Sequence, residues 1–201
     1  MSGQSTNTVP DAGTPPLPRR GWWRRNWIGL VAVAVLVPAT LAVTFSAEWG
    51  RYYADRPSQP IPVAAGESID FAGASWQVLD SRRIPSSSAE GVDARLPEGT
   101  DLVVVTVSVA PHELDADGKS PFCNLQLDEM RGSEVLRSWK DAEFSDIDYD
   151  GDPDAGSGCS SDETGDYTFE TLFVVPSGAS DELAVQLESL DELPRYLRFA
   201  L

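Results

Sequence analysis

The chain has 201 residues and a formal net charge of −17 at pH 7. The charge is unevenly divided: residues 1–26 carry +3, whereas residues 47–201 carry 11 basic and 31 acidic side chains, a net charge of −20. Nucleic-acid binding needs a basic surface that neutralises phosphates, so no nucleic-acid partner is expected. Flat contact of the acidic part with anionic lipid is disfavoured as well.

The first 26 residues are predicted to form a disordered tail. Ser, Thr, Pro and Gly dominate the first 20 positions. Such a composition cannot bury enough apolar surface to offset the entropy lost on ordering.

An uncharged stretch of 19 residues runs from Trp27 to Phe45. As a helix it spans roughly 29 Å at ~1.5 Å per residue, which matches a hydrocarbon core of about 30 Å. Aromatic residues stand before and after it, where rings favour the headgroup zone. The sequence therefore predicts a single transmembrane helix over residues 27–46. Four arginines precede it closely, so the positive-inside rule puts the N-terminus in the cytoplasm and the C-terminal part outside the cell membrane.

A cleaved signal peptide is the alternative. Thr40-Leu41-Ala42 is a weak cleavage site, and Pro38 resembles the break that often precedes one. The long leader, and an apolar run longer than the usual signal core of about 7–15 residues, favour the anchor. In both cases the acidic part of the chain is exported.

Alternating apolar and polar residues dominate after a Pro-rich stem over residues 47–62. Strands are predicted at 68–71, 74–80, 102–110, 123–127, 135–139, 167–175, 183–187 and 196–201. Gly and Pro turns separate these strands, and residues 189–195 suit one short helical turn. Short strands without intervening long helices indicate an all-β fold, a β-sandwich over residues 63–201.

Cys123 and Cys159 are the only cysteines, and both follow the apolar stretch. In an oxidising compartment such a pair forms a disulfide. A redox-active thiol pair is the alternative, although the sequence has no C-x-x-C arrangement.

Three patterns carry a resemblance to a known type of domain. They are Gly99-Thr100-Asp101 leading into strand 102–110, Cys123-x-Leu125-x-Leu127 followed by Gly132, and the stretch 169–176 ending in Val-Val-Pro. Together they resemble the small immunoglobulin-like extracytoplasmic domains of unknown function that are common in Gram-positive bacteria. The resemblance covers about residues 62–201. It implies an immunoglobulin-like antiparallel β-sandwich at the cell surface and offers no catalytic residues.

Residues 141–166, here called the acidic segment, depart from that pattern and contain ten acidic side chains and no basic one. Alternate positions Asp146, Asp148, Asp150, Asp152 and Asp154 resemble the start of an EF-hand calcium loop, with glycine at the sixth position. Position twelve of such a loop is Ser157 instead of the bidentate Glu. The alternative to a weak calcium site is a solvated, mobile loop, which is the simpler expectation.

Three further side chains have a structural and a functional interpretation. His112 is the only histidine and follows Pro111 at a strand end, so we expect an exposed turn residue and no multi-histidine zinc site. Trp76 and Trp139 lie within strand patterns and are predicted to pack in the core. A carbohydrate-stacking face is the functional alternative for both.

The function expected from these observations is a non-enzymatic, membrane-anchored module of the cell envelope. It would bind an envelope protein or a cell-wall partner through its loops or a sheet face. A calcium-responsive version and a hydrolase acting on an envelope polymer are the alternatives. No cofactor other than Ca²⁺ is expected.

Overall fold

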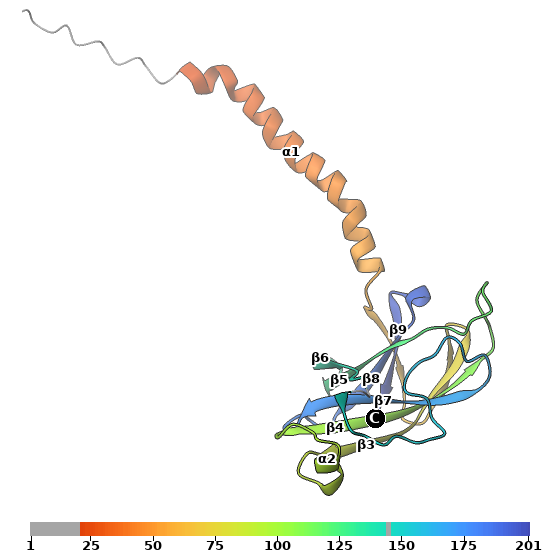
Figure 1. Cartoon of the computed structure of the whole chain (residues 1–201). Helices are drawn as coiled ribbons and strands as arrows, with labels where there is room; N and C mark the ends of the chain where they lie inside the picture. Colours follow the sequence, from red (N-terminus) through yellow and green to blue (C-terminus); the bar gives the residue numbers. More distant parts are fainter. Residues whose placement is uncertain (1–20, 144–145) are drawn as a thin grey trace, which may run out of the picture. The chain divides into compact units, whose positions relative to one another are not determined.

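Helix α1, Gly21–Ala54, is the first element of the computed structural model, which describes residues 21–143 and 146–201 (Figure 1). Its apolar side chains are exposed, as in Leu36 and Val43. Among the described residues, α1 is the one helix that is long and apolar enough to cross a membrane, criteria that a signal sequence also meets.

Helix α1 is longer than the helix predicted over residues 27–46. Residues 21–26, expected to belong to a disordered tail, form its first turns, and residues 47–54 of the expected stem form its last turns. The charged residues in these turns, such as Arg25 and Arg51, are good helix formers, so the helix continues past the apolar stretch. Residues 1–20 of the expected tail lie outside the described residues.

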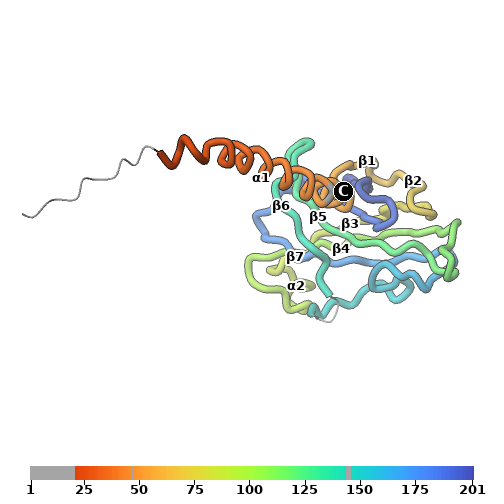
Figure 2. Tube along the Cα trace, turned by 90° about the horizontal axis from the view of Figure 1, so that it is seen from above, coloured from red at the N-terminus to blue at the C-terminus, as the bar shows by residue number. Residues whose placement is uncertain are grey.

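Two β-sheets pack face to face after this helix (Figures 1 and 2). The five-stranded sheet has the order β1 (Gln59–Val63), β9 (Arg195–Ala200), β8 (Leu183–Glu188), β5 (Asn124–Arg131) and β6 (Glu134–Lys140). The four-stranded sheet has the order β2 (Ser68–Phe71), β3 (Ala74–Pro85), β4 (Thr100–Pro111) and β7 (Tyr167–Pro176). All eight predicted strands are present.

Strand β1 corrects two expectations. It lies inside the stretch predicted as a stem, and it pairs with β9 in parallel, so the sandwich is not purely antiparallel. Pro60 and Pro62 are compatible with β1 because this strand has a partner on one side only.

The main core lies between the sheets. Strand β4 contributes Val103, Val105, Val107 and Val109, all buried, as its alternation predicts. Trp76 is fully buried, which confirms its predicted core position, and its Nε1 donates a hydrogen bond to the carbonyl of Phe71 (2.8 Å). Trp139 is partly buried against the same core.

The outer face of the four-stranded sheet is apolar too. Leu102 and Val104 of β4 and Leu172 of β7 form a second buried cluster there. Ala94, which follows the short helix α2 (Ala89–Asp93), and Ile147 of the acidic segment cover it. The acidic segment was expected to be a solvated loop: its aspartates are exposed, but its described part also contributes Ile147 to this buried cluster.

Local geometry explains the short helix α2. The Ser88 hydroxyl caps α2 by accepting a hydrogen bond from the amide of Gly91 (3.0 Å). A Cβ at Gly91 would stand 2.1 Å from the carbonyl oxygen of Pro85, so only glycine fits there. The 3₁₀ helix η2, Leu190–Glu192, lies where a single helical turn was expected.

Glu129 of β5 bonds both to the neighbouring strand β6 and to the turn between β7 and β8. Its carboxylate accepts hydrogen bonds from Arg137 of β6 and from the amide of Ser180 (2.9 Å) in the turn between β7 and β8. The Arg137 guanidinium, followed by the Ser180 amide, lowers the pKa of Glu129 below its ordinary value. The ionised form of Glu129 is therefore the one that stabilises this turn.

We predict that Glu129→Gln lowers the free energy of unfolding at pH 7 and that this deficit shrinks on acidification. Because the folded-state pKa is depressed, the carboxylate stabilises the fold above the unfolded value of about 4.3, and that contribution disappears as the pH falls through the folded-state pKa. Urea unfolding at pH 7 and pH 3 measures both deficits. Glu134→Gln, an exposed neighbour on β6, is the control. A Glu129→Gln deficit that is equal at the two pH values would contradict the explanation.

Candidate functional site

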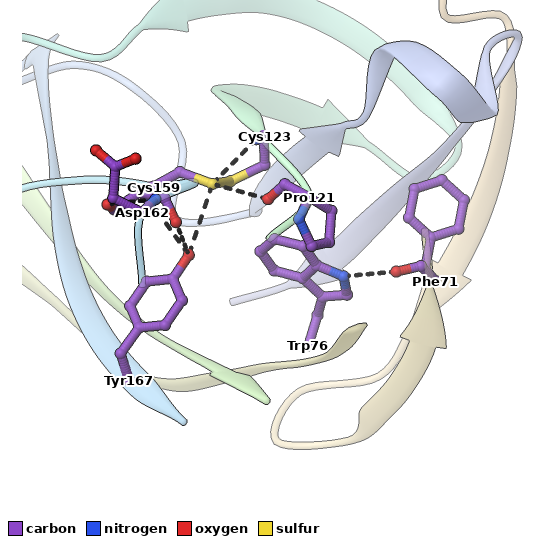
Figure 3. The surroundings of a disulfide bond; sticks show 8 residues. Phe71, Trp76, Pro121, Cys123, Cys159, Asp162 and Tyr167 are labelled. Carbon is purple, nitrogen blue, oxygen red and sulfur yellow. Dashed lines mark hydrogen bonds between the residues drawn. A yellow bond between two sulfur atoms is a disulfide. The ribbon is translucent and has the colours of Figure 1, made fainter. Parts of the chain in front are cut away.

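The acidic segment is joined to the sandwich by the Cys123–Cys159 disulfide (Figure 3). The two sulfur atoms are at bonding distance, with 5.8 Å between the Cα atoms, and no free cysteine remains among the described residues. The Cys123 amide also donates to Cys159 Sγ (3.0 Å). Figure 3 shows the bridge beside the indole of Trp76, so the acidic segment is linked directly to the edge of the main core.

Hydrogen bonds fix the residues that follow Cys159. The Tyr167 hydroxyl donates to the carbonyl of Ser160 (3.2 Å) and accepts from its amide (3.4 Å). The buried Ser120 donates its amide to the carbonyl of Ser161 (3.0 Å) and its hydroxyl to the carbonyl of Glu163. Burial raises the pKa of Tyr167, so its hydroxyl stays protonated and remains a donor.

The first half of the acidic segment is held by Arg82 of β3. Its guanidinium donates to the Tyr149 hydroxyl (2.6 Å) and to Glu90 of α2 (2.7 Å). The Tyr149 hydroxyl lies 3.4 Å from the buried carboxylate of Glu170. Burial raises the pKa of Tyr149. Glu170 also accepts the amide of Asp152 (3.1 Å). A cation from one sheet thus fixes an aromatic side chain of an otherwise anionic segment.

The acidic segment also covers the outer edge of β7, the last strand of its sheet. Ala142 forms an antiparallel bridge with Leu172, and Gly156 forms a parallel bridge with Phe169. The amide of Ala142 donates to the Leu172 carbonyl (2.7 Å) and that of Gly156 to the Thr168 carbonyl (2.9 Å). Backbone groups that an open strand edge would expose are therefore paired.

The five aspartates of the predicted calcium loop are exposed, and the carboxylates of two of them make different contacts. The carboxylate of Asp148 pairs with Arg95 (2.7 Å), and that of Asp152 accepts the amide of Asp154 (2.9 Å). Across the described residues, no three His, Cys, Asp or Glu side chains form a group suited to a metal ion. The calcium site over Asp146, Asp148, Asp150, Asp152 and Asp154 gains no geometric support and stays a prediction from the sequence.

A hollow of about 630 Å³ lies between the acidic segment and the ends of β4 and β7. It is lined by Ser108, Asp154, Gly156, Ser157, Gly158, Cys159, Ser160, Glu163, Asp166, Tyr167 and Thr168. We call this feature the acidic hollow, because three carboxylates line it and no basic side chain does. Chemically, such a lining attracts ammonium or guanidinium groups and repels anions.

His112 is exposed at the end of β4, as expected for a turn residue. Its side chain is 46% exposed, and its Nε2 lies 3.8 Å from a carboxylate oxygen of Asp70. It therefore stands on the surface, outside the lining of the acidic hollow.

Several residues that build this site carry no recognisable signal in the sequence. Arg82, Glu170 and Ser120 hold the acidic segment, yet each looks ordinary within a strand or loop. The available signal was indirect: Ile147 and Tyr149 are apolar or aromatic side chains among carboxylates, a pattern typical of anchoring points.

The chain matches no protein-family model and no curated protein. Two solved structures are similar to it. One, described as a candidate lipoprotein of Bacillus subtilis, has 12% identity and a TM-score of 0.40, over 67% of this chain and 38% of its own length. The other, an uncharacterised β-sandwich protein of Clostridium difficile, has 9% identity and a TM-score of 0.38, over 72% of this chain and 95% of its own. The chain thus spans less than half of the Bacillus protein, and neither similarity transfers a function.

We predict that replacing both cysteines by alanine lowers the free energy of unfolding by about 3–4 kcal/mol, because the bridge closes a loop of nearly forty residues in the unfolded chain. Urea unfolding without reductant measures the loss. Dithiothreitol serves as the control: it should destabilise the natural chain and leave the double variant unchanged. Equal effects of the reductant on both proteins would rule out the bridge as the cause.

Proposed function

We propose that the chain is a single-pass membrane protein whose N-terminus is cytoplasmic and whose acidic sandwich is a non-catalytic binding module of the cell envelope. Helix α1 supports the anchor by its length and composition. The arginines before the apolar stretch support the orientation. A disulfide-bonded cysteine pair is typical of an oxidising, extracytoplasmic compartment.

An immunoglobulin-like arrangement is the finer part of this proposal. The chain crosses between the sheets from β1 to β2, from β4 to β5, from β6 to β7 and from β7 to β8, as strands do in Greek-key sandwiches. The predicted pattern of short strands and turns agrees with such an arrangement. Loops at the ends of such sandwiches are common binding surfaces.

The observation that carries the proposed binding role is the acidic hollow. Asp154, Glu163 and Asp166 are exposed, while the disulfide and the bonds of Tyr167 and Ser120 fix the backbone around them. A fixed backbone spares much of the ordering entropy that a mobile loop would lose on binding. The complementary partner is an envelope protein or a cell-wall polymer that presents cationic groups.

A defined cationic probe tests this role with the full chain in lipid discs. We predict that the triple variant Asp154→Asn, Glu163→Gln, Asp166→Asn weakens binding of a lysine-rich heptapeptide by about fivefold or more at physiological salt. Fluorescence anisotropy of the labelled peptide measures the dissociation constants.

The matched control removes the same charge elsewhere. Asp80→Asn, Glu98→Gln and Glu134→Gln neutralise three exposed carboxylates outside the acidic hollow. This control should change the affinity less than about twofold, because distant exposed charges are screened. Equal weakening by the two triple variants would mean that the peptide senses net charge alone, and the proposed site would be wrong.

A further inference from the structure

Three exposed apolar side chains lie in or next to the segments that border a hollow at one end of the sandwich. Leu114 and Phe122, in the loop between β4 and β5, are 48% and 52% exposed, and Leu190 at the start of η2 is 68% exposed. Leu114 and Phe122 line a hollow of about 430 Å³ together with Asp191 and Glu192 of η2. We call Leu114, Phe122 and Leu190 the apolar tip.

The same end of the sandwich receives the chain from α1. The amides of Ser58 and Gln59 both donate to the carbonyl of Pro194 (3.0 Å each), four residues after Leu190. Only residues 55–58 separate the end of α1 from β1. Four residues span at most about 14 Å, so this end cannot move far from the end of the helix.

The length of α1 brings its C-terminal end close to the bilayer surface. Its 34 residues form a helix about 51 Å long, against a bilayer of about 40–45 Å that includes both headgroup layers. Trp49, Tyr52 and Tyr53 lie near its last turn, and such rings favour the headgroup zone. If α1 spans the membrane, the short connection therefore leaves the apolar tip within reach of the lipid headgroups.

We propose that the apolar tip inserts into the headgroup layer of the membrane that α1 crosses. This inference rests on the anchoring role proposed above. The transfer of Leu and Phe side chains from water to the boundary between headgroups and acyl chains is favourable. Glu113, Asp115, Asp191 and Glu192 line the neighbouring hollow together with one cation, Lys119, so its net charge is negative and favours zwitterionic over anionic lipid. Insertion would hold the tethered end of the sandwich at the bilayer surface.

Photo-crosslinking of the full chain in phosphatidylcholine discs tests this contact. The photoreactive amino acid p-benzoylphenylalanine replaces Phe122 or Leu190 in separate variants. The matched control replaces Val92, which is 63% exposed on α2 beyond the opposite end of β3. A fourth variant carries p-benzoylphenylalanine in place of Trp49 and reports on the anchor itself. Mass spectrometry then counts lipid adducts after irradiation.

The expected result is at least about fivefold more lipid adduct at positions 122 and 190 than at position 92. Lipid adducts at position 49 without an excess at 122 and 190 would overturn the tip contact and leave the anchor intact. Crosslinks from 122 or 190 to a second copy of the chain, in place of lipid, would also overturn it. Absence of lipid adducts at position 49 would overturn the anchor, and the tip contact would fail with it.

Discussion

Strand β4 is buried on both of its faces, and the rest of the domain is arranged around this constraint. Its inward valines fill the space between the sheets, while Leu102 and Val104 point the other way and are equally buried. A sheet face that carries such side chains must be covered, because large exposed apolar patches lead to association. Ala94, directly after helix α2, and Ile147 of the acidic segment provide that cover. The segment with the highest density of negative charge is therefore also a structural layer.

This dual role explains how the acidic segment stays attached to the sandwich although its ten carboxylates repel one another. Ile147 contributes apolar burial, and Arg82 and Arg95 supply cations at the points where the acidic segment meets the sandwich. Surface ion pairs are individually weak, so burial and the disulfide carry most of the attachment. Three carboxylates of the segment, those of Asp154, Glu163 and Asp166, border the acidic hollow. The proposed binding role assigns the recognition of a cationic partner to this anionic surface.

The alternation of side chains predicted every strand except β1, and it predicted the burial of Trp76. Strand β1 was missed because its two prolines read as a stem, although an edge strand tolerates them. Helix α2 is too short to show a helical period. The cover over the four-stranded sheet had a signal in the unbroken apolar run from Leu102 to Val105, which is typical of a strand buried on both faces. The partners of the aspartates had no signal in the sequence, because Asp148 and Arg95 are far apart along the chain and only folding brings them together.

The central claim is that the described part of the acidic segment is an ordered layer of the fold, and amide hydrogen exchange of the full chain tests it most directly. The amides of Ala142, Asp152 and Gly156 donate to acceptors on β7. The account predicts that they exchange at least about 100-fold more slowly than the same residues in an unstructured peptide. Exchange at the unstructured rate, while β4 and β7 stay protected, would show that the segment is a free loop.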